Sequence, residues 1–468
     1  MHENVRYVKF DDGIRAYLGG IVLRVKRLAL AVAAASALVS AQAGIAGAES
    51  VPGSAGATDA MLAVAADGSP RVAFAAADGS LVVASRTADG IWADEDVAGL
   101  PGAPLVVGLA AGPAGAVVLA EDPQAHWLDL AEQRAGGWTV RTVARAPAGG
   151  LLGFAGLALD HGGRPLIAYA YELRSRKTWL RLVHEDAQGR LAGERVTRAG
   201  FPSSDVLPAA APVVLPSGAV RVVEAYDTAT IEWARTKSRT DWIGQFLYGS
   251  ALGSPAGVLK AVAGPSGVWS AWTELFPSLG ESQLVLALHL RGESSTVLFH
   301  HAFLVSLALS PTGPEVGGDD YVDLEGLRTV YAGLVVDAAG NTLELDGDLK
   351  GYEVDAAGGR QYLLQQPDGL DWYRAAAPPA ARVTLAAGVQ GASFALSGSV
   401  GGVTSGSVEL YRETEAGQEL FATAPVAADG TFSTVDLPPT RPLLYRAVYV
   451  DPSSGLPIAS LVRTVLGG

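Results

Sequence analysis

One pattern recurs along most of this chain: a short apolar strand, a turn that contains glycine, and a second apolar strand. The segment from Leu62 to Phe74 shows it around Gly68, and the segment from Leu157 to Tyr169 repeats it around Gly163. Weaker copies place their turn glycines at Gly115, Gly218, Gly267 and Gly340. The intervals between successive glycines are similar, except that the one from Gly267 to Gly340 is longer. Such a repeat restricts the chain to folds that are assembled from similar, neighbouring units.

A tryptophan follows three of these glycines at nearly the same distance. Trp92 follows Gly68, Trp138 follows Gly115 and Trp242 follows Gly218, and the three offsets differ by at most one position. Each tryptophan comes just after a loop of small or polar residues. Residues that pack neighbouring units together recur in each unit, whereas the residues of a single binding site occur only once. The matching offsets therefore predict that the three indoles are structural and buried in equivalent places.

Between residues 60 and 377 the sequence offers short alternating strands and no long, capped amphipathic helix. Repeated units of four strands predict an all-β chain that folds as a β-propeller. Six blades fit the spacing, at 60–100, 105–147, 153–200, 208–250, 256–310 and 320–377. The longer interval between Gly267 and Gly340 leaves room for a seventh blade. A series of β-sandwiches is the structural alternative.

Two of the loops carry a motif-like pattern, Ser85-Arg-Thr-Ala-Asp-Gly-Ile-Trp92 and Arg134-Ala-Gly-Gly-Trp-Thr139. They resemble the Asp-box turns, Ser-x-Asp-x-Gly-x-Thr-Trp, of secreted bacterial β-propellers of the sialidase-like kind. This chain departs from the motif, because Asp89 directly precedes Gly90 and the second copy has no Asp. The resemblance implies a bladed architecture over residues 60–377 and does not imply sialidase activity.

The end of the chain reads as a separate β domain. A small, Pro-containing linker at 378–381 separates residues 60–377 from residues 382–468. Strands are predicted at 383–385, 393–400, 407–412, 420–426, 430–434, 443–450 and 458–465, which is the size of one β-sandwich. The sequences at 408–412, 426–433 and 442–451 resemble bacterial immunoglobulin-like domains of secreted and cell-surface proteins. That resemblance implies a spacer or an adhesive module.

Residues 1–48 have the features of an upstream segment and a secretory signal peptide. Arg24 to Arg27 is positively charged, Leu28 to Val39 is an uncharged apolar run, and Ala41-Gln-Ala43 fits a small-x-small cleavage pattern. Cleavage is predicted after Ala43, with a second candidate site after Ala48. The apolar run is shorter than the roughly 20 residues that a membrane-spanning helix needs. We therefore expect a secreted or cell-envelope protein whose mature chain has no membrane span.

Charge and composition exclude several classes of function. The formal net charge of −14 disfavours nucleic acid as a partner, because an acidic surface repels phosphates. The chain has no Cys, so it has no disulfide, no thiolate zinc site and no cysteine nucleophile. Motifs for a serine nucleophile elbow, a zinc protease helix and a phosphate-binding loop are also absent from the sequence.

Two acidic clusters are the candidates for a metal site. One contains Asp319 and Asp323, and the other contains Asp346 and Asp348. The second cluster begins like a calcium loop, but Lys350 stands where an oxygen ligand is needed. We therefore interpret both clusters as solvated turns and predict neither a metal nor a cofactor.

Aromatic residues are the better indication of ligand binding. Trp179, Trp269 and Trp272 are candidates for stacking on a ligand, with packing inside the blades as the alternative. The sequence favours a non-enzymatic binding or cell-envelope protein whose partner is a carbohydrate or a surface protein. The alternative is a carbohydrate-active hydrolase or lyase, which would need carboxylates that converge at the centre of the propeller.

Overall fold

The computed structural model describes residues 48–100, 103–122, 127–146, 151–173, 177–197, 201–202, 208–226, 229–236, 241–249, 254–265, 267–276, 281–289, 294–300, 302–323, 329–338, 341–375, 382–390, 393–414, 417–436, 443–460 and 463–465. These residues form strands and turns and no helix, which confirms the all-β prediction. None of them belongs to a helix with the length and hydropathy needed to cross a membrane. Ala43 and the linker 378–381 lie outside the described residues, so signal cleavage and the domain boundary stay predictions.

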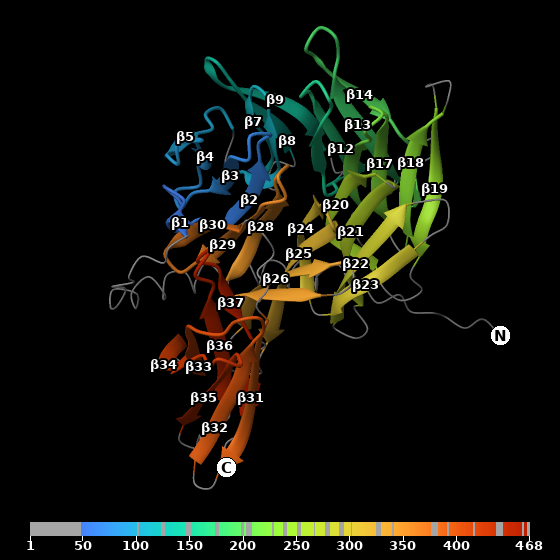
Figure 1. Ribbon diagram of the computed structural model, residues 1–468. Coiled ribbons are helices and arrows are strands. Elements are labelled where there is room, and N and C mark those ends of the chain that lie inside the picture. The colour runs from blue at the N-terminus through green and yellow to red at the C-terminus, as the bar shows by residue number, and fades with distance from the viewer. Residues whose placement is uncertain are drawn as a thin grey trace, which may run out of the picture. The chain divides into compact units, whose positions relative to one another are not determined.

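Strands of the first half of the chain form successive antiparallel sheets (Figure 1). The first sheet contains β2 (Asp59–Val64), β3 (Pro70–Ala75), β4 (Leu81–Arg86) and β5 (Trp92–Asp96). The second contains β6 (Leu105–Gly112), β7 (Gly115–Asp122), β8 (Trp127–Arg134) and β9 (Gly137–Arg145). The third contains β10 (Leu151–Leu152), β11 (Gly156–Leu159), β12 (Pro165–Glu172), β13 (Lys177–Glu185), β14 (Leu191–Arg195) and β15 (Phe201–Pro202).

The series continues with sheets of the same kind. The fourth contains β16 (Ala209–Val214), β17 (Val220–Tyr226), β18 (Ala229–Arg235) and β19 (Trp242–Gly249). The fifth contains β20 (Ser254–Gly264), β21 (Gly267–Phe276), β22 (Glu281–His289) and β23 (Ser294–His300). The sixth begins with β24 (Ala302–Ser310), β25 (Gly313–Asp323), β26 (Thr329–Asp337) and β27 (Thr342–Leu345). The seventh contains β28 (Asp348–Val354), β29 (Arg360–Gln366), β30 (Gly369–Ala375) and, from the other end of the chain, β1 (Glu49–Ser50).

Local sequence explains the strand order within a sheet. Gly68, Gly115 and Gly218 each form the turn between the first and second strands of a sheet, with φ of +83°, +138° and +78°. Glycine adopts such backbone angles without the steric cost that a Cβ atom imposes. Second and third strands, such as β3 and β4, are buried along most of their length and carry mainly apolar residues. The fourth strand is more exposed, as in β9.

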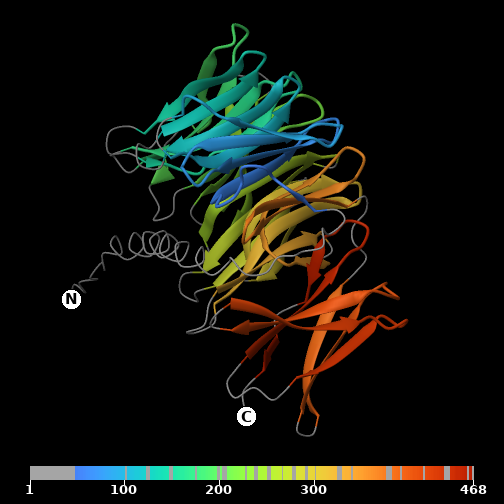
Figure 2. The same cartoon turned by 90° about the vertical axis from the view of Figure 1, so that its left-hand side faces the viewer.

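One strand of each sheet contacts the corresponding strand of the next sheet. We call these seven strands the inner strands: β2, β6, β11, β16, β20, β24 and β28. The last of them, β28, contacts the first, β2. Figure 2 shows the first sheets, in blue and teal, layered on one another. Sheets arranged in this way around a common centre form a β-propeller.

An apolar cluster fills the space between each pair of successive sheets. Between the first two sheets, for example, Val83 packs near Val118, and between the next two Leu119 packs near Ile167. Further clusters lie between the third and fourth, fourth and fifth, fifth and sixth, and sixth and seventh sheets. Phe74 of the first sheet shares a cluster with Leu363 of the seventh. Face-to-face burial of this kind supplies the apolar core that a single sheet lacks.

The predicted count of six blades is not confirmed, because residues 254–375 form three sheets where two were expected. The turn glycines that the sequence analysis missed are Gly313, with φ of +133°, and Gly358, with φ of +85°. Gly313 follows Gly267, and Gly358 follows Gly313, at nearly the interval that separates Gly68 from Gly115. The period therefore continues unbroken, and the alternative of seven units agrees with the sheets. Gly340, which was taken as the next turn glycine, lies outside the described residues.

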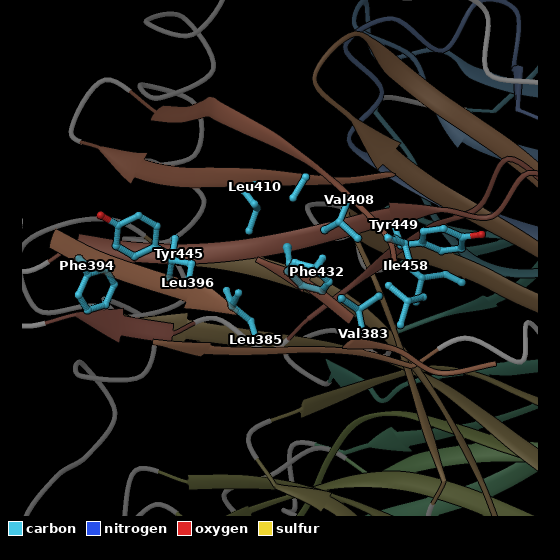
Figure 3. Packing of buried hydrophobic residues seen from close by; sticks show 14 residues of the cluster. Val383, Leu385, Phe394, Leu396, Val408, Leu410, Phe432, Tyr445, Tyr449 and Ile458 are labelled. Carbon is cyan, nitrogen blue, oxygen red and sulfur yellow. The ribbon is translucent and has the colours of Figure 1, made fainter. Parts of the chain in front are cut away.

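Residues 383–465 form two groups of strands around one core (Figure 3). One group contains β31 (Val383–Gln390), β32 (Ser393–Val400) and β35 (Thr431–Asp436). The other contains β33 (Ser407–Thr414), β34 (Gly417–Pro425), β36 (Leu443–Val450), β37 (Pro457–Ala459) and β38 (Arg463–Val465). Leu396 of the first group and Leu410 and Tyr445 of the second are fully buried in this core. We call this part of the chain the sandwich.

The sandwich and the sixth sheet share hydrogen-bonded strands. β37 pairs with β27, with Leu345 opposite Ile458, so the sixth sheet continues into β36, β33 and β34. Leu456 is fully buried in the apolar cluster between the sixth and seventh sheets. Residues Ala46–Gly468 accordingly form one compact unit.

Candidate functional site

The three equivalent tryptophans lie at the start of outermost strands, Trp92 in β5, Trp138 in β9 and Trp242 in β19. Trp242 is buried in the cluster between the third and fourth sheets. Trp92 and Trp138 are half-buried and pack against the clusters on either side of the first sheet. All three therefore contact apolar residues between sheets.

The predicted ligand-stacking residues lie mainly inside the fold. Trp272 is 1% exposed in the cluster between the fourth and fifth sheets, a position that leaves no ring face for a ligand. Trp269 is half-buried and packs against the cluster between the fifth and sixth sheets. Trp179 is also half-buried, with the guanidinium carbon of Arg195 4.1 Å from its ring centroid. These positions favour the packing alternative.

The two members of one predicted acidic cluster, Asp346 and Asp348, have different partners in the structure. Asp348 instead lies near a residue of the other predicted cluster. Asp346 forms an ion pair with Arg446 of the sandwich at 2.7 Å, away from Asp348. Asp348 instead pairs with Lys350 at 2.6 Å and interacts with Asp319 of the other predicted cluster. Asp323 ends β25, and its side chain is outside the description. Within the described residues, no group of three or more His, Asp or Glu side chains is arranged to hold a metal ion.

Asp319, Asp348, Lys350 and Asp59 form one group of interacting charges, which we call the rim carboxyl cluster. Burial raises the pKa of Asp319 well above its usual range, and the neighbouring carboxylate of Asp348 raises it further. The Asp319 and Asp348 carboxyl groups therefore lie close enough to interact, and the ionised form of Asp319 is disfavoured. The Oδ1 atom of Asp348 is buried without a hydrogen-bond partner among the described residues. The negative charge of Asp348 is balanced by Lys350.

Backbone hydrogen bonds fix two carboxyl groups of this cluster. The amide of Leu349 donates to Asp319 Oδ1 at 2.6 Å, and the amide of Val106 donates to Asp59 Oδ2 at 2.7 Å. Each amide belongs to the inner strand of the next sheet and directly precedes a β-bulge. Burial raises the pKa of Asp59, although the Val106 hydrogen bond opposes that change. The cluster thus joins neighbouring sheets as well as carrying charge.

A third inner strand makes the equivalent connection between sheets, but here the acceptor of the backbone hydrogen bond is not a carboxylate. There the amide of Leu304 donates to the Thr273 hydroxyl at 2.8 Å, again just before a bulge in the inner strand. A neutral hydroxyl therefore suffices for the structural bond. The carboxyl groups of Asp319 and Asp59 therefore add ionisable groups that the structural bond does not require.

The inner strands begin at the same end of the propeller. They lie side by side, and the bridge between Phe154 and Ala209 is parallel. Asp59 and Asp348 are the first residues of β2 and β28, so they lie at this end. We call the residues at the starts of the inner strands the rim.

The rim also carries exposed apolar side chains. Phe154, which precedes β11, and Phe303, the second residue of β24, are each 40% exposed, and Leu105, the first residue of β6, is 42% exposed. Phe303 is the register partner of Asp319, and paired residues project to the same face of a sheet. The rim therefore combines exposed aromatic rings with carboxylates.

A second charged pair lies deeper along the inner strands. Lys260 of β20 interacts electrostatically with Glu353 of β28. β24 contacts both strands and separates them in the ring order, so the two charges meet across the inside of the ring. Burial raises the pKa of Glu353 to about 7, with Lys260 opposing the change, and burial lowers the pKa of Lys260. Both side chains are only half-buried, which leaves them within reach of water.

Sequence reasoning missed Asp59, Phe154, Phe303 and the pair of Lys260 and Glu353. Each is isolated in the sequence, and only the order of the sheets brings them to one end or one interior. The sequence pattern that could have identified the rim residues is a polar or aromatic residue at the start of a predicted first strand. In the sequence, Lys350 indicates only that the segment from Asp346 does not complete a calcium loop.

Comparisons with known proteins agree with a β-propeller. No protein-family model and no curated protein matches the chain. Among solved structures, the β-propeller domain of Cps50 (Swd1) from Myceliophteria thermophila has a TM-score of 0.45 at 12% identity, over 69% of this chain and 98% of that one. A six-bladed, fucose-recognising lectin from Aleuria aurantia has a TM-score of 0.40 at 13% identity, over 68% and 90%. A putative 6-phosphogluconolactonase from Bacteroides uniformis has a TM-score of 0.42 at 12% identity, over 63% and 87%. The assignment to a β-propeller rests on the sheets of this chain, since all three TM-scores are below 0.5.

Proposed function

We propose that this chain is an exported binding protein that takes a carbohydrate at the rim of its propeller. The observation that carries the proposal is the exposure of Phe154 and Phe303 at the rim that also holds the carboxyl groups of Asp59 and Asp348. A sugar offers apolar C–H groups on its ring face and hydroxyl groups around its edge. Aromatic rings pack against the first, and carboxylates accept hydrogen bonds from the second.

Binding is favoured over hydrolysis by the state of the carboxyl groups. A glycoside hydrolase places two carboxyl groups on either side of the bond it cleaves, about 5 Å or more apart. Asp319 and Asp348 instead lie close enough to interact directly, and Lys350 pairs with Asp348. Asp319 and Asp348 are therefore suited to presenting a fixed arrangement of charge to a ligand. A carbohydrate-active enzyme remains the alternative and is an outcome of the experiment below.

The architecture proposed for this function is a seven-bladed propeller followed by an immunoglobulin-like sandwich. Seven sheets with an apolar cluster between each successive pair, including the seventh and first, support the blade count. Pairing of β1 with β30 supplies the fourth strand of the last blade. Two facing groups of strands around one core support the sandwich. The positively charged, apolar and small-residue order before Ala43 supports export.

The experiment is a binding screen of neutral oligosaccharides with the chain that begins at Gly44, followed by calorimetry on the best ligand. Phe154→Ser and Phe303→Ser should each weaken affinity about tenfold, equivalent to about 1.4 kcal/mol. Ile243→Ser is the matched control, because Ile243 is 61% exposed on the outermost strand β19 and lies outside the rim. No binding to any sugar, or equal losses in all three variants, would exclude the proposal. Release of a shortened sugar would replace it with the enzymatic alternative.

A further inference from the structure

The sandwich holds the short segment that leads into the seventh sheet. Arg446 of β36 donates from Nη2 to the carbonyl of Leu345 at 2.9 Å and pairs through Nη1 with Asp346 Oδ1 at 2.7 Å. The amide of Asp346 donates to the carbonyl of Pro457 at 3.0 Å. Three contacts from the sandwich therefore fall on two consecutive residues.

The same segment is fixed from the propeller side. Gln366 donates to the carbonyl of Asp346 at 3.2 Å, and the amide of Gly333 donates to the carbonyl of Gly347 at 2.6 Å. Gly347 has a φ of +136°, and a Cβ atom placed there would approach the Gln366 amide nitrogen to 2.9 Å. The backbone at this point has little freedom to shift.

Two residues after Asp346, the chain enters the rim carboxyl cluster. Asp348 pairs with Lys350, and the next amide, that of Leu349, donates to Asp319. Every residue from Leu345 to Leu349 thus makes a hydrogen bond or an ion pair. A displacement of Asp346 would be passed directly to Asp348, because only Gly347 lies between them.

Arg446 is buried, with 3% of its side chain exposed, while Asp346 retains 24%. Both Nη atoms of this buried guanidinium have partners, Asp346 and the Leu345 carbonyl, while Nε has none among the described residues. The second sandwich arginine with acidic partners, Arg412, pairs with Glu419 and Asp436, both within the sandwich. Of these two arginines, Arg446 is the one that reaches the propeller segment carrying a rim carboxylate.

We propose that Arg446 is a positioning residue for the rim: the sandwich, through Arg446, fixes the spacing of the Asp319 and Asp348 carboxyl groups. The proposal rests on the proposed function in that the rim is taken as the ligand site. It assigns the sandwich a part in building that site, which a spacer on a flexible linker would not have.

The experiment compares Arg446→Met, Arg446→Lys and the control Arg412→Met in the chain that begins at Gly44. Carboxyl carbon-13 NMR follows the titration of Asp319, assigned with Asp319→Asn, in the presence of its charged neighbours Asp59, Asp348 and Lys350. In Arg446→Met the midpoint for Asp319 should fall by about one pH unit, because the two carboxyl groups separate. Arg446→Lys should give a smaller fall, and Arg412→Met should match the parent. Affinity for the sugar should drop about tenfold in Arg446→Met only.

The outcomes separate the two proposals. A parental Asp319 titration in folded Arg446→Met would overturn the positioning role and leave Arg446 as a clamp between domains. If Arg446→Met does not fold, Arg446→Lys decides, and a parental titration in it overturns the role. If the Asp319 titration shifts in Arg446→Met while the parent protein binds no sugar, the positioning role is supported and the proposed function is excluded.

Discussion

The indole nitrogen of Trp92 donates a hydrogen bond to Glu49 Oε2 at 2.9 Å. Glu49 belongs to β1 on the seventh sheet, and Trp92 begins the outermost strand of the first sheet. Arg86 of the first sheet also pairs with Glu49, at 2.6 Å, and lies over the ring of Trp372 of the seventh. The meeting point of the first and last sheets is therefore held by polar bonds as well as by apolar packing.

Truncation of the repeated tryptophans should destabilise the propeller unequally. Trp242→Ala should lower the free energy of unfolding by about 3–5 kcal/mol, because its indole is buried in a core. Trp92→Ala and Trp138→Ala should cost less, since both indoles are half-buried. Denaturant unfolding of the three variants checks the order, with Ile91→Ala as the control because Ile91 is 65% exposed. Parental stability in all three tryptophan variants would mean that the indoles serve a ligand.

Loss of Glu49 should weaken the junction of the first and seventh sheets. Glu49→Gln removes the charge but leaves an oxygen for Trp92, and should cost about 0.5–1 kcal/mol, because the pair is partly exposed. Glu49→Ala removes both bonds and should cost about 1–2 kcal/mol. Urea unfolding in low and high salt checks this, and the loss in Glu49→Gln should shrink at high salt. Glu419→Ala, at a 54% exposed partner of Arg412, should have little effect.

The stability of the chain should fall as the pH rises from about 5 to about 8. Burial raises the pKa of Glu224 to about 7, and that carboxyl group is fully buried and accepts a bond from Trp233. A raised pKa means that the folded state holds the proton more tightly, so this stability is present at low pH and lost through pH 7. Glu224→Gln should remove about 2–3 kcal/mol of the pH dependence. Urea unfolding at both pH values tests this against exposed Glu95→Gln; an unchanged dependence in Glu224→Gln would contradict it.

Cleavage of the linker at 378–381 should not separate the two parts of the chain. Pairing of Leu345 with Ile458 and burial of Leu456 against the propeller should keep the fragments together. Limited proteolysis followed by native size-exclusion chromatography checks this, and both fragments should elute in one peak. A C-terminal fragment that elutes alone would show that the sandwich is an independent spacer.

Export should remove the residues up to Ala43 and leave β1 intact. The exported protein should begin at Gly44, shortly before Glu49, and mass spectrometry of its N-terminus checks this. A secreted chain that still contains Leu28 would contradict the prediction. A chain shortened to begin at Gly53 should lose stability, because the seventh sheet would lack β1.

Sequence reasoning succeeded where the repeat or the alternation of a strand was local. The turn glycines Gly68, Gly115 and Gly218 and the strands of the sandwich were located from short-range patterns. The preferred count of six blades fell one short because the turn from Asp355 to Gly359 resembles the turn from Asp160 to Gly163 and marks a further unit. In both turns the aspartate Oδ1 accepts backbone amide bonds.

Other features have no local signal at all. β1 has two residues, and nothing in Glu49 and Ser50 predicts a partner strand at the far end of the propeller. The rim carboxyl cluster depends on side chains from β2, β25 and β28, which meet only when the sheets are stacked. Long-range geometry of this kind cannot be derived from one sequence.

The pairing of β1 with β30 also sets a limit on when the molecule can be completed. Ser50 donates to Asp371, 321 residues later, so β1 lacks its partner strand until nearly the whole propeller has been synthesised. At ordinary rates of translation that interval is about 15–65 s. During this time β1 has no partner strand, and the face of the first sheet that packs against the seventh stays uncovered.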